Sequence, residues 1–373
     1  MRILFAGGGT GGHFFPLIAV ARELHALAAE KRLARLRLEL MSDRPFDEEL
    51  LRAEDIEFIG VPAGKMRRYV SFWNVTDILR TITGVFRAVT HMFVSLPDVI
   101  FATGGYASFP VLFAGRVFRV PIIIHESDAI PGRVNRWAAA FAARIAVSFP
   151  QAVQFFPLEK TALVGNPIRK DILGGNDQEA REVFRLESSV PVLLVLGGSQ
   201  GAMALSDVLV DALPELVPQV QIIHQIGRRS FEEVHQRAAV VLEKNPRRER
   251  YHPFAFFDAA HLRNASRAST LILARSGSGI FEIAAWGKPS ILVPLPGSAQ
   301  DHQRENAYAY AHAGGAVVVE QKNLSPHILV SEVLKLVQDT AGLEKMRRAA
   351  ESFARIDAAR KVAEEIIRLG VHE

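Results

Sequence analysis

The feature that most constrains this fold is a short apolar strand that runs through a glycine-rich loop into a helix, and it occurs twice. The first copy is Arg2–Ala6, the loop at residues 7–13 and a helical pattern through Leu27. The second is the run at 191–196, the loop at 197–201 and a helix over 202–213. The two copies lie about half the chain length apart, so we expect each to open its own α/β domain.

The remaining apolar runs alternate with helix-length segments. In the first half they are residues 36–40, 99–102, 121–124 and 145–147, and in the second half 221–225, 271–274, 290–293 and 316–319. Strands that alternate with helices form parallel sheets covered on both faces. Turn residues near Gly165 predict a boundary there, with domains at 1–165 and 166–345. Two final helices are expected at 343–353 and 358–369, the second capped by Asp357.

Composition excludes several classes of protein. Cysteine is absent, which excludes disulfides, a cysteine zinc site and a thiol nucleophile. The absence also favours a cytoplasmic location. No uninterrupted apolar run is long enough to span a membrane, and the segment before the first glycines is too short for a signal peptide. The net charge is only +4, and the stretch 64–96 accounts for all of it. Such a local excess indicates an anionic partner rather than a nucleic acid.

The first loop, Gly7-Gly8-Gly9-Thr10-Gly11-Gly12-His13, is the densest signal. Glycines allow close approach of the backbone, and the helix that follows directs free N–H groups at a phosphate or diphosphate. The pattern also fits the dinucleotide fingerprint, with Glu39 or Asp43 as the acid that would bind a ribose. An NAD-dependent dehydrogenase is therefore an alternative.

The second loop formally matches the nucleophile elbow of hydrolases through Ser199, but Asp301 and His302 are adjacent, which is poor geometry for a triad. We therefore favour anion binding there as well. Glu282 lies one turn into a helix, where its carboxylate suits a ribose diol. The alternative is that it serves only as a favourable charge at the helix N-terminus. Gln303 follows the strand at 290–293, where α/β sheets bind ligands. The run from His125 to Asp128 lacks a second ligand at helical spacing, so we expect no metal.

Taken together, these motifs resemble a known family. Those that carry the resemblance occur in order along the chain: residues 7–13, Gly104-Gly105-Tyr106, His125-Glu126, Pro131-Gly132 with Asn135-Arg136-Trp137, residues 165–169, 197–202 and Arg275-Ser276-Gly277. They are similar to the MurG glycosyltransferases of glycosyltransferase family 28. That family transfers N-acetylglucosamine (GlcNAc) from UDP-GlcNAc to lipid I, a polyprenyl-diphospho-MurNAc-peptide, giving lipid II in peptidoglycan synthesis. The resemblance implies a GT-B fold: two Rossmann-like domains facing across a cleft, with residues 346–373 returning to the first.

The resemblance also assigns residues to roles. It implies His13 as the general base and Thr10, Gly11 and Gly12 at the diphosphates. Around the donor it places Asp128, Arg169, Ser199, Phe257, Ser278, Gly279, Ile280, Phe281, Glu282 and Gln303. The acceptor and diphosphate loops would comprise Gly7, Gly8, Gly9, Gly104, Gly105, Tyr106, His125, Glu126 and Asn135. Two departures stand out: Ser127-Asp128 replaces the usual Gln-Asn, and the span 275–282 is one residue shorter than is typical.

The chemistry needs a base for the attacking hydroxyl and stabilisation of the departing diphosphate. A histidine suits the first task, and helix N-termini with Arg169 suit the second, so no cofactor is expected. A single in-line displacement would invert the anomeric centre. The alternatives are a related glycolipid synthase, the dehydrogenase, or a non-catalytic protein that binds a sugar nucleotide and releases no product.

A last expectation concerns the membrane. Lys65, Arg67, Arg68, Phe72 and Trp73 interleave cations with aromatic rings, which predicts a peripheral patch on the anionic cytoplasmic leaflet. The helical stripe that follows, over residues 75–96, is expected to be mostly core. The enzyme would then act at the cytoplasmic face of the cell membrane, where a lipid-linked acceptor is met.

Overall fold

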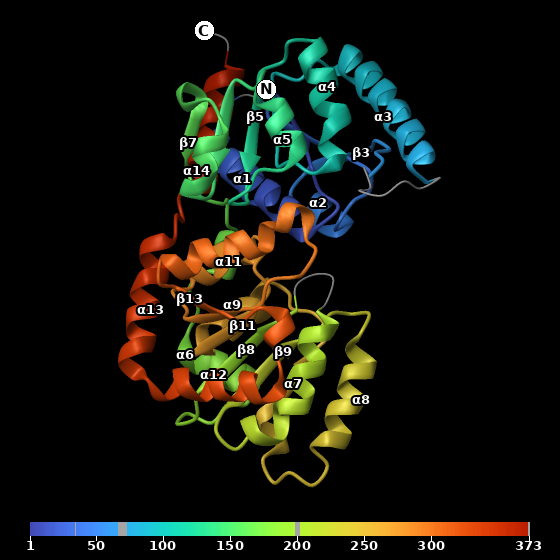
Figure 1. Ribbon diagram of the computed structural model, residues 1–373. Helices are drawn as coiled ribbons and strands as arrows, with labels where there is room; N and C mark the ends of the chain where they lie inside the picture. Colours follow the sequence, from blue (N-terminus) through green and yellow to red (C-terminus); the bar gives the residue numbers. More distant parts are fainter. Residues whose placement is uncertain (34, 66–72, 198–201, 372–373) are drawn as a thin grey trace. The chain divides into compact units, whose positions relative to one another are not determined.

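The computed structural model describes residues 1–33, 35–65, 73–197 and 202–371 (Figure 1). The chain divides into two compact units. The first comprises Met1–Arg169 together with Arg355–Glu373, and the second comprises Lys170–Ala354. The division after Arg169 falls four residues beyond the turn at Gly165.

The first unit is built on a parallel sheet. Within the described residues its seven strands are β1 (Arg2–Ala6), β2 (Arg37–Ser42), β3 (Ile56–Gly60), β4 (Val99–Ala102), β5 (Ile122–Glu126), β6 (Arg144–Val147) and β7 (Thr161–Leu163). They run in the order β3-β2-β1-β4-β5-β6-β7. The helices are α1 (Gly11–Glu30), α2 (Glu48–Ala53), α3 (Trp73–Ser95), α4 (Phe109–Val117), α5 (Arg133–Ala138) and α14 (Ala358–Gly370). The strand order reverses direction between β1 and β4, and this switch point is where open α/β sheets bind ligands.

Alternation along β1 divides the core of this unit between the two faces of the sheet. Ile3 and Phe5 pack with α1 and α14 on one face. Leu4 and Ala6 pack on the other face with residues of α3 and α4. All four side chains are fully buried, as a period of two requires of a strand with both faces covered.

The second unit repeats the plan. In the described part of the chain its sheet has six parallel strands in the order β10-β9-β8-β11-β12-β13. They are β8 (Val192–Leu196), β9 (Gln221–Gln225), β10 (Tyr251–Phe254), β11 (Leu271–Ala274), β12 (Ser290–Leu292) and β13 (Ala316–Val318). The helices are α6 (Asp177–Phe184), α7 (Met203–Leu216), α8 (Phe231–Val241), α9 (Ala259–Ala268), α10 (Gly279–Ala285), α11 (His302–His312), α12 (Pro326–Gln338) and α13 (Thr340–Phe353). The switch point here lies between β8 and β11.

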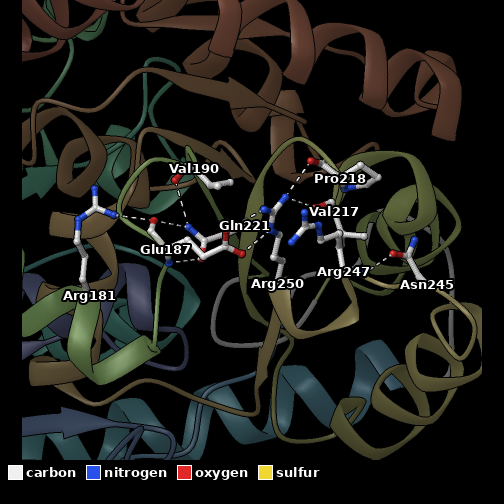
Figure 2. A network of polar contacts seen from close by, with 9 residues as sticks. All are labelled: Arg181, Glu187, Val190, Val217, Pro218, Gln221, Asn245, Arg247 and Arg250. Carbon is white, nitrogen blue, oxygen red and sulfur yellow. Dashed lines mark hydrogen bonds and ion pairs between the residues drawn. The ribbon is translucent and has the colours of Figure 1, made fainter.

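A network around Arg250 holds the amino ends of three strands together (Figure 2). Arg250 pairs bidentately with the Glu187 carboxylate, at 2.7 Å from Nε and 2.8 Å from Nη2, and also donates to the carbonyls of Val217 and Pro218. Gln221 donates to the carbonyls of Glu187 and Val190. The network ties the segment before β8 to the starts of β9 and β10, and Arg250 at 8% exposed is nearly enclosed.

The end of the chain differs from the expectation that residues 346–373 return together to the first domain. Helix α13 belongs to the second unit, because the Phe353 ring packs against Tyr310 and Phe281, with centroids 4.9 and 5.8 Å away. Only the segment from Arg355 joins the first unit, where α14 packs beside α1. Asp357 stands at the cap position of α14, but its side chain makes no capping bond and pairs with Lys361 instead.

The expectation that the stripe over 75–96 is mostly core is wrong. Val75, Ile78, Leu79, Ile82, Phe86 and Phe93, which we call the α3 apolar face, are 53–72% exposed. The helix docks through its opposite, small-residue side instead. A Cβ on Gly84 would lie 1.9 Å from the Pro62 carbonyl oxygen, and Ala88 and Met92 are fully buried. Figure 1 shows α3 on the outside of the first unit beside α4.

In the described chain, none of the helices combines the length and apolar character that a membrane crossing requires.

Candidate functional site

The first glycine loop leaves β1 at the switch point of the sheet. Gly7, Gly8 and Gly9 have φ values of +144°, +105° and +82°, which side chains rarely allow. A Cβ on Gly7 would also lie 2.2 Å from the Thr103 hydroxyl oxygen. That hydroxyl donates to the His13 carbonyl oxygen at 2.9 Å. The end of β4 therefore holds the first turn of α1 in place.

The N-terminus of α1 is arranged for an anion. Thr10 is extended at the cap position, its side chain makes no capping bond, and the first turn contains no acidic residue. The Thr10 carbonyl accepts from the N–H groups of His13 and Phe14, so those of Gly11 and Gly12 precede the first intrahelical bonds. A twenty-residue helix places partial positive charge at this point.

His13, the expected base, lies beside the loop after β4. A Cβ on Gly105 would lie 3.4 Å from His13 Nε2, so the ring packs directly against this glycine. A Cβ on Gly104 would likewise lie 2.8 Å from Asn135 Nδ2. Tyr106 follows, with the Lys65 ammonium 5.3 Å from its ring centre, and burial raises the pKa of this tyrosine. The structure thus brings the two glycine loops, His13, Tyr106 and Asn135 to one edge of the sheet.

Glu126, at the end of β5, is an acceptor for three N–H groups. Its carboxylate accepts from Asp128 N and Gly132 N, both at 3.0 Å, and from Asn135 Nδ2 at 2.9 Å. Burial, together with the nearby Asp128 charge, raises the pKa of Glu126 to about 8. Glu126 therefore fixes the loop that presents half-buried Asp128, and its own side chain is enclosed at 3% exposed.

His125 and Arg169 are also placed by packing. His125 is fully buried, with Nε2 at 3.1 Å from both Gly165 O and Ser148 Oγ. Burial lowers the pKa of His125 to about 4, so this ring is neutral at physiological pH and joins the ends of neighbouring strands. Arg169 Cζ lies 4.0 Å from the centre of the Phe15 ring, a cation–π contact that orients the guanidinium beside α1.

In the second unit, polar bonds join the loops that follow β11 and β12. Ser276 Oγ donates to the Gln303 carbonyl oxygen at 2.7 Å, and Asn306 Nδ2 donates to Ser276 O at 3.2 Å. The Gln303 side-chain oxygen accepts from Leu295 N at 3.0 Å. Gln303, which we expect to contact the sugar-nucleotide donor, is therefore held against the loop that leads to Glu282. Asn306, three residues after Gln303, is a polar group that suits sugar hydroxyls by its position after the strand, and in the structure its amide braces the Ser276 loop.

Arg275 extends this brace to a third segment. Its guanidinium donates to Val293 O at 3.0 Å and to the Gln321 side-chain oxygen at 2.7 Å, and burial lowers its pKa. Nearby, Gln300 and Asp301 have φ values of +56° and +58°, a strained left-handed pair just before α11. Non-glycine residues with left-handed φ values are common at binding sites.

The other residues of the second unit that we expect around the sugar-nucleotide donor fall into three groups. Ser278, Gly279 and Glu282 are half-buried at the start of α10, where a ligand could reach them. Ile280, Phe281 and Phe257 are at most 4% exposed; Phe257 packs against Phe254 with ring centres 5.1 Å apart. Only backbone atoms of these three could meet a ligand. Ser199 lies outside the described residues.

The expected membrane segment is only partly described. Arg67, Arg68 and Phe72 lie outside the described residues, and Trp73 begins α3. The α3 apolar face follows directly, with six large apolar side chains that are 53–72% exposed. For metals, the described part of the chain contains no cluster of three or more histidine, aspartate or glutamate side chains that could hold an ion.

Comparison with known proteins matches both units. The glycosyltransferase family 28 N-terminal domain matches residues 3–147, and the C-terminal domain of that family matches residues 192–363. The chain is 34% identical to the UDP-N-acetylglucosamine–N-acetylmuramyl-(pentapeptide) pyrophosphoryl-undecaprenol N-acetylglucosamine transferase of Treponema denticola, over 94% of this chain and 93% of the relative. It is 30% identical to the protein of the same name from Bacillus cytotoxicus, over 98% of each. The crystal structure of Acinetobacter baumannii MurG shares the fold, with a TM-score of 0.73 at 24% identity over 98% of this chain and 99% of that one.

Proposed function

This chain belongs to glycosyltransferase family 28, and from that premise we propose that it transfers GlcNAc from UDP-GlcNAc to the C4 hydroxyl of MurNAc in lipid I, releasing UDP and lipid II. The observation that carries the proposal is the match to transferases of this name over nearly the whole chain. Neither the dehydrogenase nor the glycolipid synthase is favoured by these matches. The reaction belongs to peptidoglycan synthesis and cell-wall biogenesis.

His13 acts as the general base in this proposal. It lies at the start of α1 beside the loop of β4, and its neutral form can accept the proton of the attacking hydroxyl. The N-terminus of α1 supplies N–H groups for the acceptor diphosphate, which keeps that group close to the base. Tyr106 and Asn135 line the same edge of the sheet and complete the acceptor side.

The second unit binds the donor. Glu282 accepts hydrogen bonds from the ribose diol, and Gln303 contacts the sugar from the segment that Ser276 holds in place. Arg169 and helix N-termini stabilise the negative charge that develops on the departing UDP, so the proposal needs no metal or other cofactor. A single displacement inverts the anomeric configuration of the transferred sugar.

Contact with the membrane is the third part of the proposal. The α3 apolar face exposes Ile82 and Phe86 at 61% and 69%, and Lys65 and Arg87 supply positive charge before and along the helix. Apolar side chains can enter the interfacial layer while basic residues attract anionic headgroups, which gives reversible, peripheral binding. The protein would thereby reach a lipid-linked acceptor at the cytoplasmic face.

The decisive experiment measures UDP release from UDP-GlcNAc with and without a lipid I analogue. We expect release to depend on the acceptor and to match the amount of disaccharide product formed. If free GlcNAc appears equally fast without acceptor, the protein is a hydrolase and the proposal fails.

The donor assignment is tested separately by Glu282→Gln. Loss of a charge-assisted hydrogen bond costs about 1.5–3 kcal/mol, so the dissociation constant for UDP-GlcNAc should rise roughly 10- to 150-fold. The matched control is Glu305→Gln, which removes an exposed acid from the first turn of α11. Equal donor affinity in Glu282→Gln and in the unchanged protein, measured by calorimetry, would return Glu282 to a role at the helix start.

Membrane contact is tested by sedimentation with vesicles that contain anionic lipid. Binding should weaken as salt rises, because the electrostatic part is screened. Replacing Ile78, Ile82 and Phe86 together by serine should release the protein while activity on a water-soluble acceptor is kept. The triple change of Arg67, Arg68 and Trp73 tests the preceding segment in the same assay. Vesicle binding that resists salt and both triple changes would place the anchor elsewhere.

A further inference from the structure

A cavity of about 520 Å³ lies in the second unit, at the edge opposite the candidate donor loops. Its lining includes Thr270, which directly precedes β11, and Lys288, which lies two residues before β12. These are the amino ends of parallel strands, whereas the loops that carry Glu282 and Gln303 follow the carboxyl ends of the same strands. The two ends of a parallel strand lie at opposite edges of its sheet, so the cavity is separate from the donor site.

Lys288 has an unusual environment within this cavity. Its ammonium donates to Arg267 O at 3.0 Å and to Ser269 O at 2.6 Å. An ammonium has three N–H donors, so these two carbonyls leave one for an occupant of the cavity. Burial, with the Arg267 charge as a smaller cause, lowers the pKa of Lys288 to about 8. Its charged form therefore lacks the stabilisation that water would supply.

The other cations around the cavity are paired with acids. Arg267, from α9, forms a bidentate pair with Asp177 of α6 at 2.9 and 3.0 Å. Arg347, from α13, pairs with Glu344 at 2.7 Å and also with Glu351. Among the described residues, no carboxylate lies within ion-pair distance of Lys288. The lining therefore contains the paired charges of Arg267, Arg347, Glu344 and Glu351 together with Lys288, whose ammonium has carbonyl partners instead of an acid.

We propose that this cavity binds a small oxyanion, the phosphate or carboxylate group of a metabolite, with Lys288 as its charged contact. The Thr270 oxygen accepts from Val192 N at 3.1 Å, which leaves its own hydrogen to donate to the anion. Trp286 lines the cavity with its indole held by a 2.8 Å bond to Ile172 O. Its flat ring offers apolar surface to the carbon skeleton of the ligand.

Binding at this site has a pH dependence with a definite sign. A bound anion stabilises the ammonium of Lys288, so binding is accompanied by proton uptake where the empty site is partly neutral. With a starting pKa of about 8, affinity should fall about tenfold between about pH 7 and about pH 9. Hydrogen bonds from Arg347 and Arg348 lower the pKa of Glu344, and the Glu344 carboxylate raises the pKa of Arg347, so these two groups keep their charges over this range. The other charged groups around the site are Arg267 with its partner Asp177, and Glu351.

The test is calorimetric titration with sulfate and with citrate, in saturating UDP so that the proposed donor site is filled. Sulfate keeps its charge over this pH range and represents a phosphate; citrate represents a carboxylate. We expect binding of at least one probe, and the stronger probe identifies the ligand class. Lys288→Gln keeps two N–H donors for the carbonyls but removes the charge, and should weaken binding at least tenfold. Lys335→Gln, an exposed lysine of α12, is the matched control.

Three results would overturn the proposal. One is the absence of heat from both probes with the unchanged protein. Another is equal affinity in Lys288→Gln, whose folding is checked by its affinity for UDP. The third needs no variant: sulfate binding that is unchanged from about pH 7 to about pH 9 would show that Lys288 is not the contact.

Discussion

Helices α1 and α3 both belong to the first unit, and both contain a helical stripe of apolar residues, but they are buried to very different extents. In α1, Phe14, Leu17 and Leu24 are at most 1% exposed. In α3, Ile82 and Phe86 are more than 60% exposed. The sheet covers α1 on one side and α14 covers it on another, whereas α3 packs on α4 and the segment around Pro62.

The difference shows what an apolar stripe does and does not predict. Periodicity identifies the apolar side of a helix, but it does not say whether another part of the chain covers that side. In α3 the docking side consists of Gly84, Ala88 and Met92, two of them small enough for the backbones to approach closely. The large side chains then face outward, which is the arrangement expected of a surface that meets a partner.

The largest expected effect is at the start of α1. His13→Ala should lower turnover roughly 10²–10⁴-fold, the usual contribution of general base catalysis, with donor affinity retained. His25→Ala is the control, because His25 lies in the same helix and its ring contacts the Glu54 carbonyl oxygen, at 3.0 Å from Nε2. Steady-state kinetics with a lipid I analogue measure both variants. Near-normal turnover of His13→Ala would rule out His13 as the general base.

Next in size is the cost of removing a buried leucine from α1. Leu24→Ala should lower the free energy of unfolding of the first unit by about 2–5 kcal/mol, through lost apolar contact and a residual cavity. Urea unfolding followed by circular dichroism measures the change. A loss below about 1 kcal/mol would mean that the site collapses around the smaller side chain, and the contrast with α3 would be weaker than burial indicates.

A smaller effect is expected on the docking side of α3. In Gly84→Ala the new methyl group meets the Pro62 carbonyl oxygen, so the helix must shift, at a cost of about 1–3 kcal/mol. Thr83→Ala, an exposed neighbour in the same helix, should be nearly neutral. Equal unfolding midpoints for the two variants would contradict the close approach of α3 to this segment.

The smallest effect on stability is expected on the α3 apolar face itself. Leu79→Ala replaces the same residue type as Leu24→Ala, but at 58% exposure, and should change the free energy of unfolding by no more than about 0.5 kcal/mol. A large destabilisation would show that Leu79 is covered in solution by part of this chain. The pair of leucine variants therefore measures the difference between the two helices directly.

Much of the fold follows from the sequence, and the strands that the sequence does not predict share one physical feature. The strands expected at Arg2–Ala6, 99–102, 221–225 and 271–274 have the observed bounds. Three strands were missed, β3, β7 and β10, and all three lie at sheet edges. Edge strands are short and half exposed, so they lack a continuous apolar run: β3 contains Glu57, and β10 contains His252 and Pro253.

The positions of the loops that form the candidate site could be predicted to a similar degree. Glycine loops after strands predict an anion-binding edge, because side chains rarely allow the φ values found at Gly7 and Gly9. The braces behind those loops were not predictable. The bonds of Glu126 to Asn135, and of Arg275 to Gln321, join residues whose proximity depends on tertiary packing. Spacing along the chain contains no signal for such contacts.

The placement of α14 has a consequence for biosynthesis. The first unit begins at Met1 but is completed by a segment that starts at Arg355, after the whole second unit. On the ribosome, the sheet and α1 therefore form while the apolar side of α1 that receives Val362 and Ile366 is still bare. All residues of the second unit are made before those of α14. A nascent chain that stalls before α14 leaves the first unit unfinished and open to chaperones and proteases.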